Sequence, residues 1–255
     1  MTATPAGMTY ADYLKLDRLL SAQQPLSDLH DEMLFIVIHQ TMELWMKEML
    51  HELDYAVRLL GEGKLGEAFK AMARMSRIQA VMTLSWDVLS TLTPVDYLKF
   101  RQVLGTSSGF QSVQFREIEI RLGLREPGYI KQYPEESADR ARLEAAMEQP
   151  SLRDAAIGAL ERAGFDVADR SIEALSQVWL QIYRDADRYF ELYELAEELV
   201  DIDDSLAGWR HKHVLTVERI IGNKTGTGGS AGASYLRSTL TKRAFPELWS
   251  VRTEL

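Results

Sequence analysis

The sequence predicts an all-α fold, a helical bundle in one domain, and two observations support this prediction. Apolar residues recur at spacings of three and four along runs of roughly 15 to 30 residues, as they do on one face of a helix. Most of the 7 prolines fall at the ends of these runs, and no alternating strand pattern of useful length interrupts them. A chain of 255 residues can bury about 70 to 75% of the surface of its unfolded form. We therefore expect a single domain over residues 1–255.

Two stripes of apolar residues mark the main helices of the bundle. Within residues 28–61 the stripe consists of Leu34, Ile38, Trp45 and Met49. Within residues 169–199 the stripe consists of Ile172, Leu175, Trp179, Ile182, Tyr189, Tyr193 and Ala196. Because the members of each stripe share one helical face, each range is expected to form one long bundle helix.

Capping signals divide the rest of the chain. Thr93 and Ser151 each stand three residues before an aspartate, so helices should begin after them. Helices are expected to end at the glycines Gly105, Gly164 and Gly222. Residues 122–169 are charged and irregular in pattern, and we expect them to form a peripheral helical insertion.

Composition excludes several kinds of site and partner. The chain has no cysteine, which excludes disulfides, iron–sulfur clusters and thiolate ligands to zinc or haem. Residues 1–9 lack the features of a signal peptide, and no apolar run approaches the ~18 residues that span a membrane. The net charge of −9, spread along the chain, disfavours nucleic acid as a partner. We expect a cytoplasmic protein without a membrane or nucleic-acid partner.

His39 is the first candidate for a chemical role. It lies in an apolar stretch, with Phe35 one helical turn before it on the same face. Burial there should keep the imidazole neutral, since desolvation disfavours the charged form. The pattern is also typical of a core histidine whose ring is hydrogen-bonded to a backbone carbonyl, which spacing alone favours without excluding a functional role.

His213 is the second candidate, because its helical tract runs directly into a glycine-rich segment that begins at Asn223. A neutral imidazole can bind a transition metal or haem iron, and glycines let the backbone approach a flat or anionic ligand closely. His211 and His213 point to different faces of a helix, so they cannot bind one ion together. Between basic neighbours, His211 is expected to be solvated, whereas a packing role for His213 stays open.

Two further patterns have both a functional and a structural interpretation. Glu48 and His51 have the spacing of a ligand pair in di-iron carboxylate bundles, but the second pair that such a site needs is missing, which favours a solvated helix face. Arg101, followed by a turn with Ser107 and Ser108, could bind a carboxylate through two parallel hydrogen bonds. A surface salt bridge for the arginine and helix capping by the serines would also explain this pattern.

Taken together, these blocks resemble the tryptophan 2,3-dioxygenase family of haem enzymes. The resemblance covers about the first half and the last quarter of the chain, with several long motifs in the same order. The matching stretches are residues 9–16, 20–23, 31–45, 100–101, 107–112, 209–222, 224–230 and 245–253.

The resemblance implies a role for each candidate. His213 would be the axial ligand of haem iron, and His39 would be the catalytic histidine near the bound oxygen and the indole nitrogen. The implied substrate contacts are Phe35, Tyr97, Arg101, which would bind the carboxylate, and Thr227, which would contact the amino acid end. The implied cofactor contacts besides His213 are Ser108 and Gly109. Tyr10 and Tyr13 would complete the pocket of a neighbouring subunit in a homotetramer.

The implied reaction adds both atoms of O2 across the indole C2–C3 bond of L-tryptophan at ferrous haem b. The product is N-formyl-L-kynurenine, and the reaction is the first step of tryptophan catabolism by the kynurenine pathway. Two alternatives keep the haem pocket inside the bundle: a dioxygenase of a related indole, and a haem-binding helical protein without turnover. A di-iron protein that uses Glu48 and His51 is a third alternative.

Overall fold

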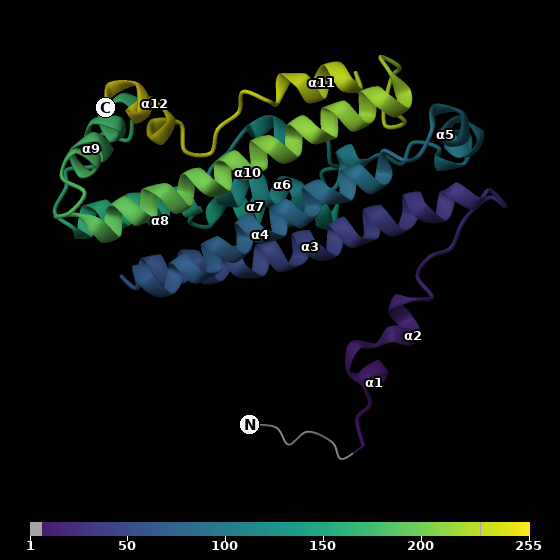
Figure 1. The fold of residues 1–255 in the computed structure, drawn as a ribbon, viewed down its shortest axis with the longest axis horizontal. Helices are drawn as coiled ribbons and strands as arrows, with labels where there is room; N and C mark the ends of the chain where they lie inside the picture. The colour runs from purple at the N-terminus through teal and green to yellow at the C-terminus, as the bar shows by residue number, and fades with distance from the viewer. Residues whose placement is uncertain (1–6, 230) are drawn as a thin grey trace.

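Three long helices form the frame of the molecule (Figure 1): α3 (His30–Gly61), α4 (Leu65–Leu89) and α10 (Phe190–Ile221). The computed structural model describes residues 7–229 and 231–255, and every regular element in these two ranges is a helix. Helix α4 packs against both α3 and α10 along their length. The predicted all-α fold is confirmed.

The shorter elements surround this frame. Helices α5 (Pro94–Phe100) and α11 (Ala233–Ser238) lie at one end of it, and α9 (Ile172–Arg184) and α12 (Pro246–Glu254) pack together at the other end (Figure 1). The remaining elements are α1 (Tyr10–Leu14), α2 (Leu16–Leu19), η1 (Arg101–Leu104), η2 (Gly109–Gln111), α6 (Val113–Leu122), η3 (Pro127–Tyr129), α7 (Ala138–Glu148) and α8 (Leu152–Arg162).

The predicted helix boundaries depend on short-range hydrogen bonds, and those at the capping signals are confirmed. The Thr93 hydroxyl accepts the N–H of Asp96, and Ser151 forms a reciprocal capping box with Asp154. The Gly222 φ of 61° places it in the left-handed region, and α10 ends there. Gly105 follows η1, and Gly164 follows the last residue of α8 by two positions.

The prediction of one continuous helix over residues 169–199 is wrong. Helix α9 ends at Arg184, and α10 begins at Phe190 after a break whose first residue, Asp185, has φ −132° and ψ 51°. Leu175 and Trp179 before the break and Leu195 after it are all buried, so the apolar spacing continues across the turn. Spacing alone therefore could not detect the break. Aspartate favours turns over helix interiors, and the Asp185-to-Asp187 stretch was the available signal.

The segment over residues 122–169 forms α7 and α8. Helix α8 packs against α3, and α7 packs against α6. Leu143, Leu152 and Leu160 in this segment are fully buried, so it contributes side chains to the apolar core. Its description as a peripheral insertion in a single domain stays a prediction.

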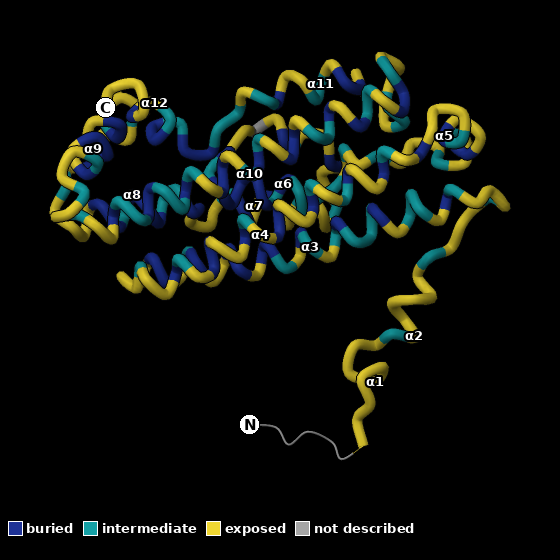
Figure 2. Tube along the Cα trace, in the orientation of Figure 1, coloured by how far each residue is buried: buried dark blue, intermediate teal, exposed yellow. Residues whose placement is uncertain are grey.

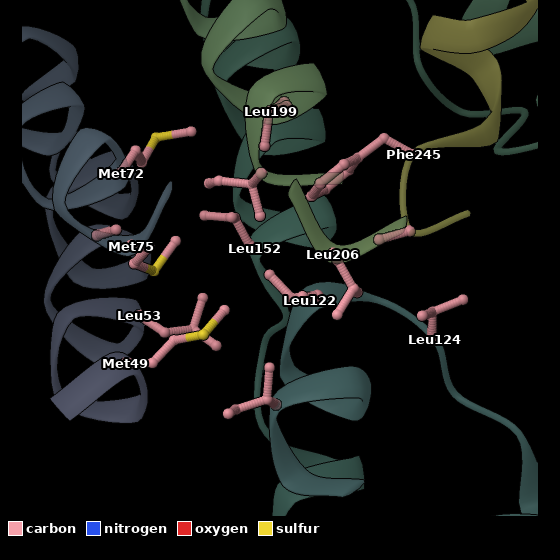
Figure 3. Close-up of a cluster of buried hydrophobic side chains, with 14 of the residues drawn as sticks. Met49, Leu53, Met72, Met75, Leu122, Leu124, Leu152, Leu199, Leu206 and Phe245 are labelled. Carbon is pink, nitrogen blue, oxygen red and sulfur yellow. The ribbon is translucent and has the colours of Figure 1, made fainter. Parts of the chain in front are cut away.

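Most of the largest buried side chains of the apolar core gather toward one end of the frame. Met49 and Leu53 of α3, Met72 and Met75 of α4, and Leu206 of α10 converge there with side chains from α6 and α8 (Figure 3). These core residues lie in the C-terminal half of α3 and the N-terminal half of α4. The core continues into the opposite halves of these helices, where Met42, Met46, Trp86 and Leu89 also line a cavity.

The N-terminal segment lies away from the frame (Figures 1 and 2). Helices α1 and α2 have no buried residue, and Tyr10 and Tyr13 are 75% and 73% exposed. None of the helices in the described ranges combines the length and the apolar character needed to cross a membrane.

Candidate functional site

A cavity of about 640 Å³ opens where the N-terminal half of α3, the C-terminal end of α4 and the C-terminal half of α10 meet. Its volume lies within the range of about 300 to 1,000 Å³ that is common for small-molecule and cofactor sites. Most of its wall is apolar or aromatic. The residues that line it include Phe35, His39, Met42, Met46, Trp86, Leu89, Tyr97, Ser108, Gly109, Phe110, Phe115, Trp209, His213, Val217, Ile220 and Thr227.

His213 lies on the α10 wall of the cavity, between aromatic rings. Its imidazole stacks on Trp86 of α4, with the ring centroids 4.3 Å apart and the planes at 6°. Trp209, one helical turn earlier, lies 5.3 Å from the same imidazole. Burial, together with a smaller contribution from charge repulsion by His39, lowers the pKa of His213 from 6.5 to about 3. The ring is therefore neutral at pH 7, as a ligand to a metal must be.

His39 lies on the α3 wall of the same cavity. The ring stands 4.2 Å from the Phe35 ring, which in turn lies near Tyr97 and Phe100 of α5. His39 Nδ1 lies 2.7 Å from the carbonyl oxygen of Phe35, one turn earlier on the helix. Burial lowers the pKa of His39, outweighing this hydrogen bond and the nearby Glu43. A neutral ring that donates from Nδ1–H keeps Nε2 as a hydrogen-bond acceptor.

Two chain segments that are far apart in the sequence meet at the third wall. The Thr227 hydroxyl of the glycine-rich segment donates to the carbonyl oxygen of Ser107, and the Arg101 guanidinium donates to the carbonyl oxygen of Thr225. A Cβ atom added to Gly228 would lie 2.7 Å from Cβ of Ser108. Only glycine allows the two segments to lie this close together.

Arg101 itself is not among the residues that line the cavity, although Gly226 and Thr227, which follow its partner Thr225, are. In the part of the chain that the structure describes, the bond to Thr225 is the only hydrogen bond or ion pair of this guanidinium. The Arg101 charge also acts on Tyr97. Burial raises the pKa of the Tyr97 hydroxyl, and the positive charge of Arg101 partly offsets this increase. Arg101 therefore lies at the edge of the site with most of its donors unused.

The structure brings most of the predicted site residues together. Phe35, His39, Tyr97, Ser108, Gly109, His213 and Thr227 all line the cavity, and Arg101 adjoins it. Tyr10 and Tyr13 lie in the exposed N-terminal segment, away from the cavity of their own chain.

The histidines outside the cavity lie on the surface. His211 is exposed, as its basic neighbours predict, and His51 is exposed at a shallow surface pocket that Glu48 also lines. Within residues 7–229 and 231–255, no group of three or more histidine, aspartate or glutamate side chains is arranged to hold a metal ion. Nothing in the described chain thus supports the di-iron alternative.

Several residues of the cavity were not found from the sequence. Trp86 and Trp209, which flank His213, are 4% and 5% exposed, and their indole N–H groups have no partner among the described residues. Three buried charged side chains also line the cavity. The Glu119 carboxylate forms ion pairs with the guanidinium groups of Arg116 and Arg210, and the N–O distance is 2.6 Å in each pair. Trp86 and Glu119 come from helices α4 and α6, so only the tertiary packing places them beside α10.

Comparison with known proteins agrees with this cavity. The family model described as tryptophan 2,3-dioxygenase matches residues 1–169 and 170–255, so it includes the segment that the motifs left unmatched. The chain belongs to the tryptophan 2,3-dioxygenase family. It is 58% identical to the tryptophan 2,3-dioxygenase of Caulobacter vibrioides, over 97% of this chain and 98% of that protein.

Other relatives with the same name have similar sequence identity to this chain. The proteins of Bacillus cereus and Exiguobacterium sibiricum are 53% and 50% identical, each over 97% of this chain and 93% of the relative. Since the matches extend over nearly the whole length of both partners, the enzymatic activity of this chain is that of the tryptophan 2,3-dioxygenase family.

Proposed function

We propose that this chain is a haem-dependent enzyme that cleaves the indole C2–C3 bond of L-tryptophan with O2, giving N-formyl-L-kynurenine. The observation that carries the proposal is a single cavity with a neutral histidine on each of two walls and an arginine at its edge. In catabolism this reaction would be the first step of the kynurenine pathway.

The residues around His213 fit a haem group. The chain has no cysteine, so a histidine is the natural axial ligand, and the neutral imidazole of His213 suits that role. The mostly apolar wall suits a porphyrin, while the Thr216 hydroxyl and two indole N–H groups at the cavity are buried without a partner among the described residues. Such buried polar atoms are costly unless a ligand or water satisfies them. When bound, haem b supplies the ferrous iron at which O2 is activated. His213 would hold that iron, and Ser108 and Gly109 would lie against the porphyrin.

His39 is proposed to orient the indole ring. Because its Nδ1–H donates to the Phe35 carbonyl, Nε2 can accept a hydrogen bond from the indole N–H of the substrate. Phe35 and Tyr97 would pack on the faces and edges of the indole. Holding the reacting carbons in one orientation is the main contribution that these residues make to the rate.

Arg101 and Thr227 are proposed to bind the amino acid end of tryptophan. The guanidinium has unused donors for a carboxylate, and a bidentate pair of this kind is stronger than a neutral hydrogen bond. Thr227 lies on the segment that closes the cavity beside Ser107, so substrate binding and exclusion of water would occur together. An indole without a carboxylate would leave the Arg101 charge unpaired, which gives selectivity for the amino acid.

The N-terminal segment supports assembly into a homotetramer. Tyr10, Tyr13 and Leu20 are strongly exposed in this segment, and α1 and α2 have no buried residue to hold them on their own frame. Exposed apolar side chains of this kind mark surfaces that contact another protein. We propose that Tyr10 and Tyr13 contact the active site of a neighbouring subunit.

The two alternatives within the same fold are less well supported. A dioxygenase of a simpler indole would have no use for Arg101 at the edge of the cavity or for Thr227 on its wall. A haem-binding protein without turnover would not need a second histidine, His39, on the α3 wall of the cavity.

The test compares two neighbouring histidines. Purified wild-type protein, His213→Ala and His211→Ala are reconstituted with haem and assayed for N-formyl-L-kynurenine from L-tryptophan. We expect His213→Ala to lose both stoichiometric haem and product, whereas His211→Ala should keep both, because His211 is exposed. Full haem binding and turnover in His213→Ala would refute the ligand assignment.

Substrate class is tested separately. Wild-type protein is offered L-tryptophan and unsubstituted indole at equal concentration, and the products are identified by mass. Cleavage of L-tryptophan alone supports the proposal, and equal cleavage of both compounds would favour the related-indole alternative.

A further inference from the structure

The proposed function leaves one feature of the cavity unexplained, which is the aromatic packing around His213. Trp86 covers one face of the imidazole in a parallel stack, at 4.3 Å and 6°. Trp209 approaches the same ring at 5.3 Å and 52°, and the two indoles contact each other at 5.4 Å. The imidazole is thus packed against two rings that come from two different helices, α4 and α10.

The two histidines of the cavity are held in different ways. His39 has a hydrogen bond from Nδ1 to a backbone carbonyl, whereas neither ring nitrogen of His213 has a hydrogen-bond partner within the described residues. In metal sites the second nitrogen of a ligating histidine usually donates to a carboxylate or carbonyl, and this bond fixes the ring orientation. At His213 no protein group of the described chain performs that task, so its orientation depends on packing.

Trp86 is better placed than Trp209 to fix the plane of the ring. Trp209 belongs to the same helix as His213 and meets the ring at a tilt, so a rotation of the imidazole changes that contact little. Trp86 comes from α4 and lies parallel to the imidazole, so rotation about the Cβ–Cγ bond of His213 would break the stack. Trp86 is also 4% exposed, and its ring packs against Trp209 as well as against His213.

We infer that Trp86 is a positioning residue, whose indole face fixes the orientation of the His213 imidazole on the iron. This inference rests on the proposed role of His213 as the iron ligand. An imidazole bound to a cationic iron gains positive character, and the negative face of an indole attracts it. The stack therefore becomes stronger when the ligand bond forms, and the plane of the ligand is tied to the packing of α4 against α10.

The test uses variants that separate the aromatic face from burial. Trp86→Leu removes the face, Trp86→Phe keeps an aromatic ring, and Trp179→Leu is the matched control. Trp179 is a buried indole of α9, outside the cavity lining, so the control removes a similar side chain without touching His213. Each protein is reconstituted with haem and studied by electron paramagnetic resonance of the ferric cyanide complex, by the resonance Raman Fe–histidine band of the ferrous form, and by the rate of haem loss to a scavenger.

For Trp86→Leu we expect several ligand orientations, seen as broadened or multiple resonance signals, and a shifted Fe–histidine band. Haem loss should be about 10-fold faster or more, the usual effect of losing an outer-shell partner of a metal ligand. kcat should fall while the KM for tryptophan stays within about twofold, since Trp86 does not contact the proposed clamp of Arg101 and Thr227. Trp86→Phe and Trp179→Leu should keep the wild-type spectra.

Two results would overturn the inference. One is a Trp86→Leu protein with wild-type spectra and wild-type haem loss. The other, which needs no variant, is a wild-type ferric protein that shows several orientations of its proximal ligand. If Trp86→Leu does not fold, the wild-type signal decides the question, with a single sharp species supporting the inference. A wild-type protein without histidine-ligated haem would instead refute the proposed function itself, so the two failures can be told apart.

Discussion

Gly228 offers the sharpest quantitative test of how the glycine-rich segment closes the site. In a Gly228→Ala variant the new Cβ would lie 2.7 Å from Cβ and 3.2 Å from Oγ of Ser108. Carbon atoms in ordinary contact lie about 3.5 to 4.0 Å apart, so the segment must retreat by roughly 1 Å. Thr227 directly precedes this residue and would retreat with it.

The expected effect on catalysis follows from this displacement. A misplacement of ~1 Å in a group that positions the substrate can cost about 100-fold in rate. We therefore expect Gly228→Ala to lower kcat/KM for L-tryptophan by about 10- to 100-fold, mainly through KM, with haem content unchanged. The assay is steady-state formation of N-formyl-L-kynurenine, with haem measured in the same samples.

Two comparisons make the result specific. Gly66→Ala serves as the control, because a Cβ there meets nothing within 4 Å. The double variant Ser108→Gly with Gly228→Ala removes the clashing Cβ and should regain part of the lost kcat/KM. Wild-type kinetics in Gly228→Ala, or no recovery in the double variant, would refute the view that contact with Ser108 sets the position of this segment.

Three further predictions concern the buried carboxylate of Glu119, the guanidinium of Arg101 and the imidazole of His39. Glu119→Gln should lower the free energy of unfolding by about 3 to 5 kcal/mol in urea titrations, because it leaves the guanidinium groups of Arg116 and Arg210, 5% and 3% exposed, without their shared carboxylate. A loss under 1 kcal/mol would show that solvent reaches this group. Arg101→Ala should raise the KM for tryptophan by about 10-fold or more, because one charge-assisted contact is lost. Arg101→Lys should reverse only part of this increase. An unchanged KM in Arg101→Ala would exclude the carboxylate role. Because burial lowers the pKa of His39 below 6.5, the neutral ring persists as pH falls, so kcat/KM should stay level above pH 6.5 and decline only below it. An acid limb centred at or above pH 6.5 that disappears in His39→Ala would contradict this.

The fold class and the frame of the cavity could be predicted because they depend on local patterns. The apolar stripe of residues 28–61 and the capping residues Thr93 and Ser151 act over three or four positions, and the structure confirms them. The apolar spacing continues across the turn at Asp185, so the spacing predicts one helix over residues 169–199 where the structure has two. A stripe reports which residues are buried but not whether the backbone between them is continuous.

The site could be predicted only in part, for a related reason. His39 and Phe35 share one helix, so their contact follows from spacing alone. Trp86 stacks on His213 across a gap of more than a hundred residues, and Arg101 meets Thr225 across a similar gap. Contacts of this kind depend on how α4 and α10 pack and on how the glycine-rich segment folds back, which the pattern of either segment does not contain. The order of the motifs therefore indicated the candidate residues, whereas their contacts with other helices came only from the structure.

The central claim is that the cavity between α3, α4 and α10 holds a histidine-ligated haem with room for tryptophan beside it. The most direct measurement is the absorption spectrum of the purified, haem-reconstituted and reduced protein, recorded with and without L-tryptophan. We expect one haem per chain, the spectrum of a ferrous haem with a single histidine ligand, and a distinct shift on adding L-tryptophan. Substoichiometric haem, a ligand set with two histidines, or a spectrum that L-tryptophan leaves unchanged would contradict the claim.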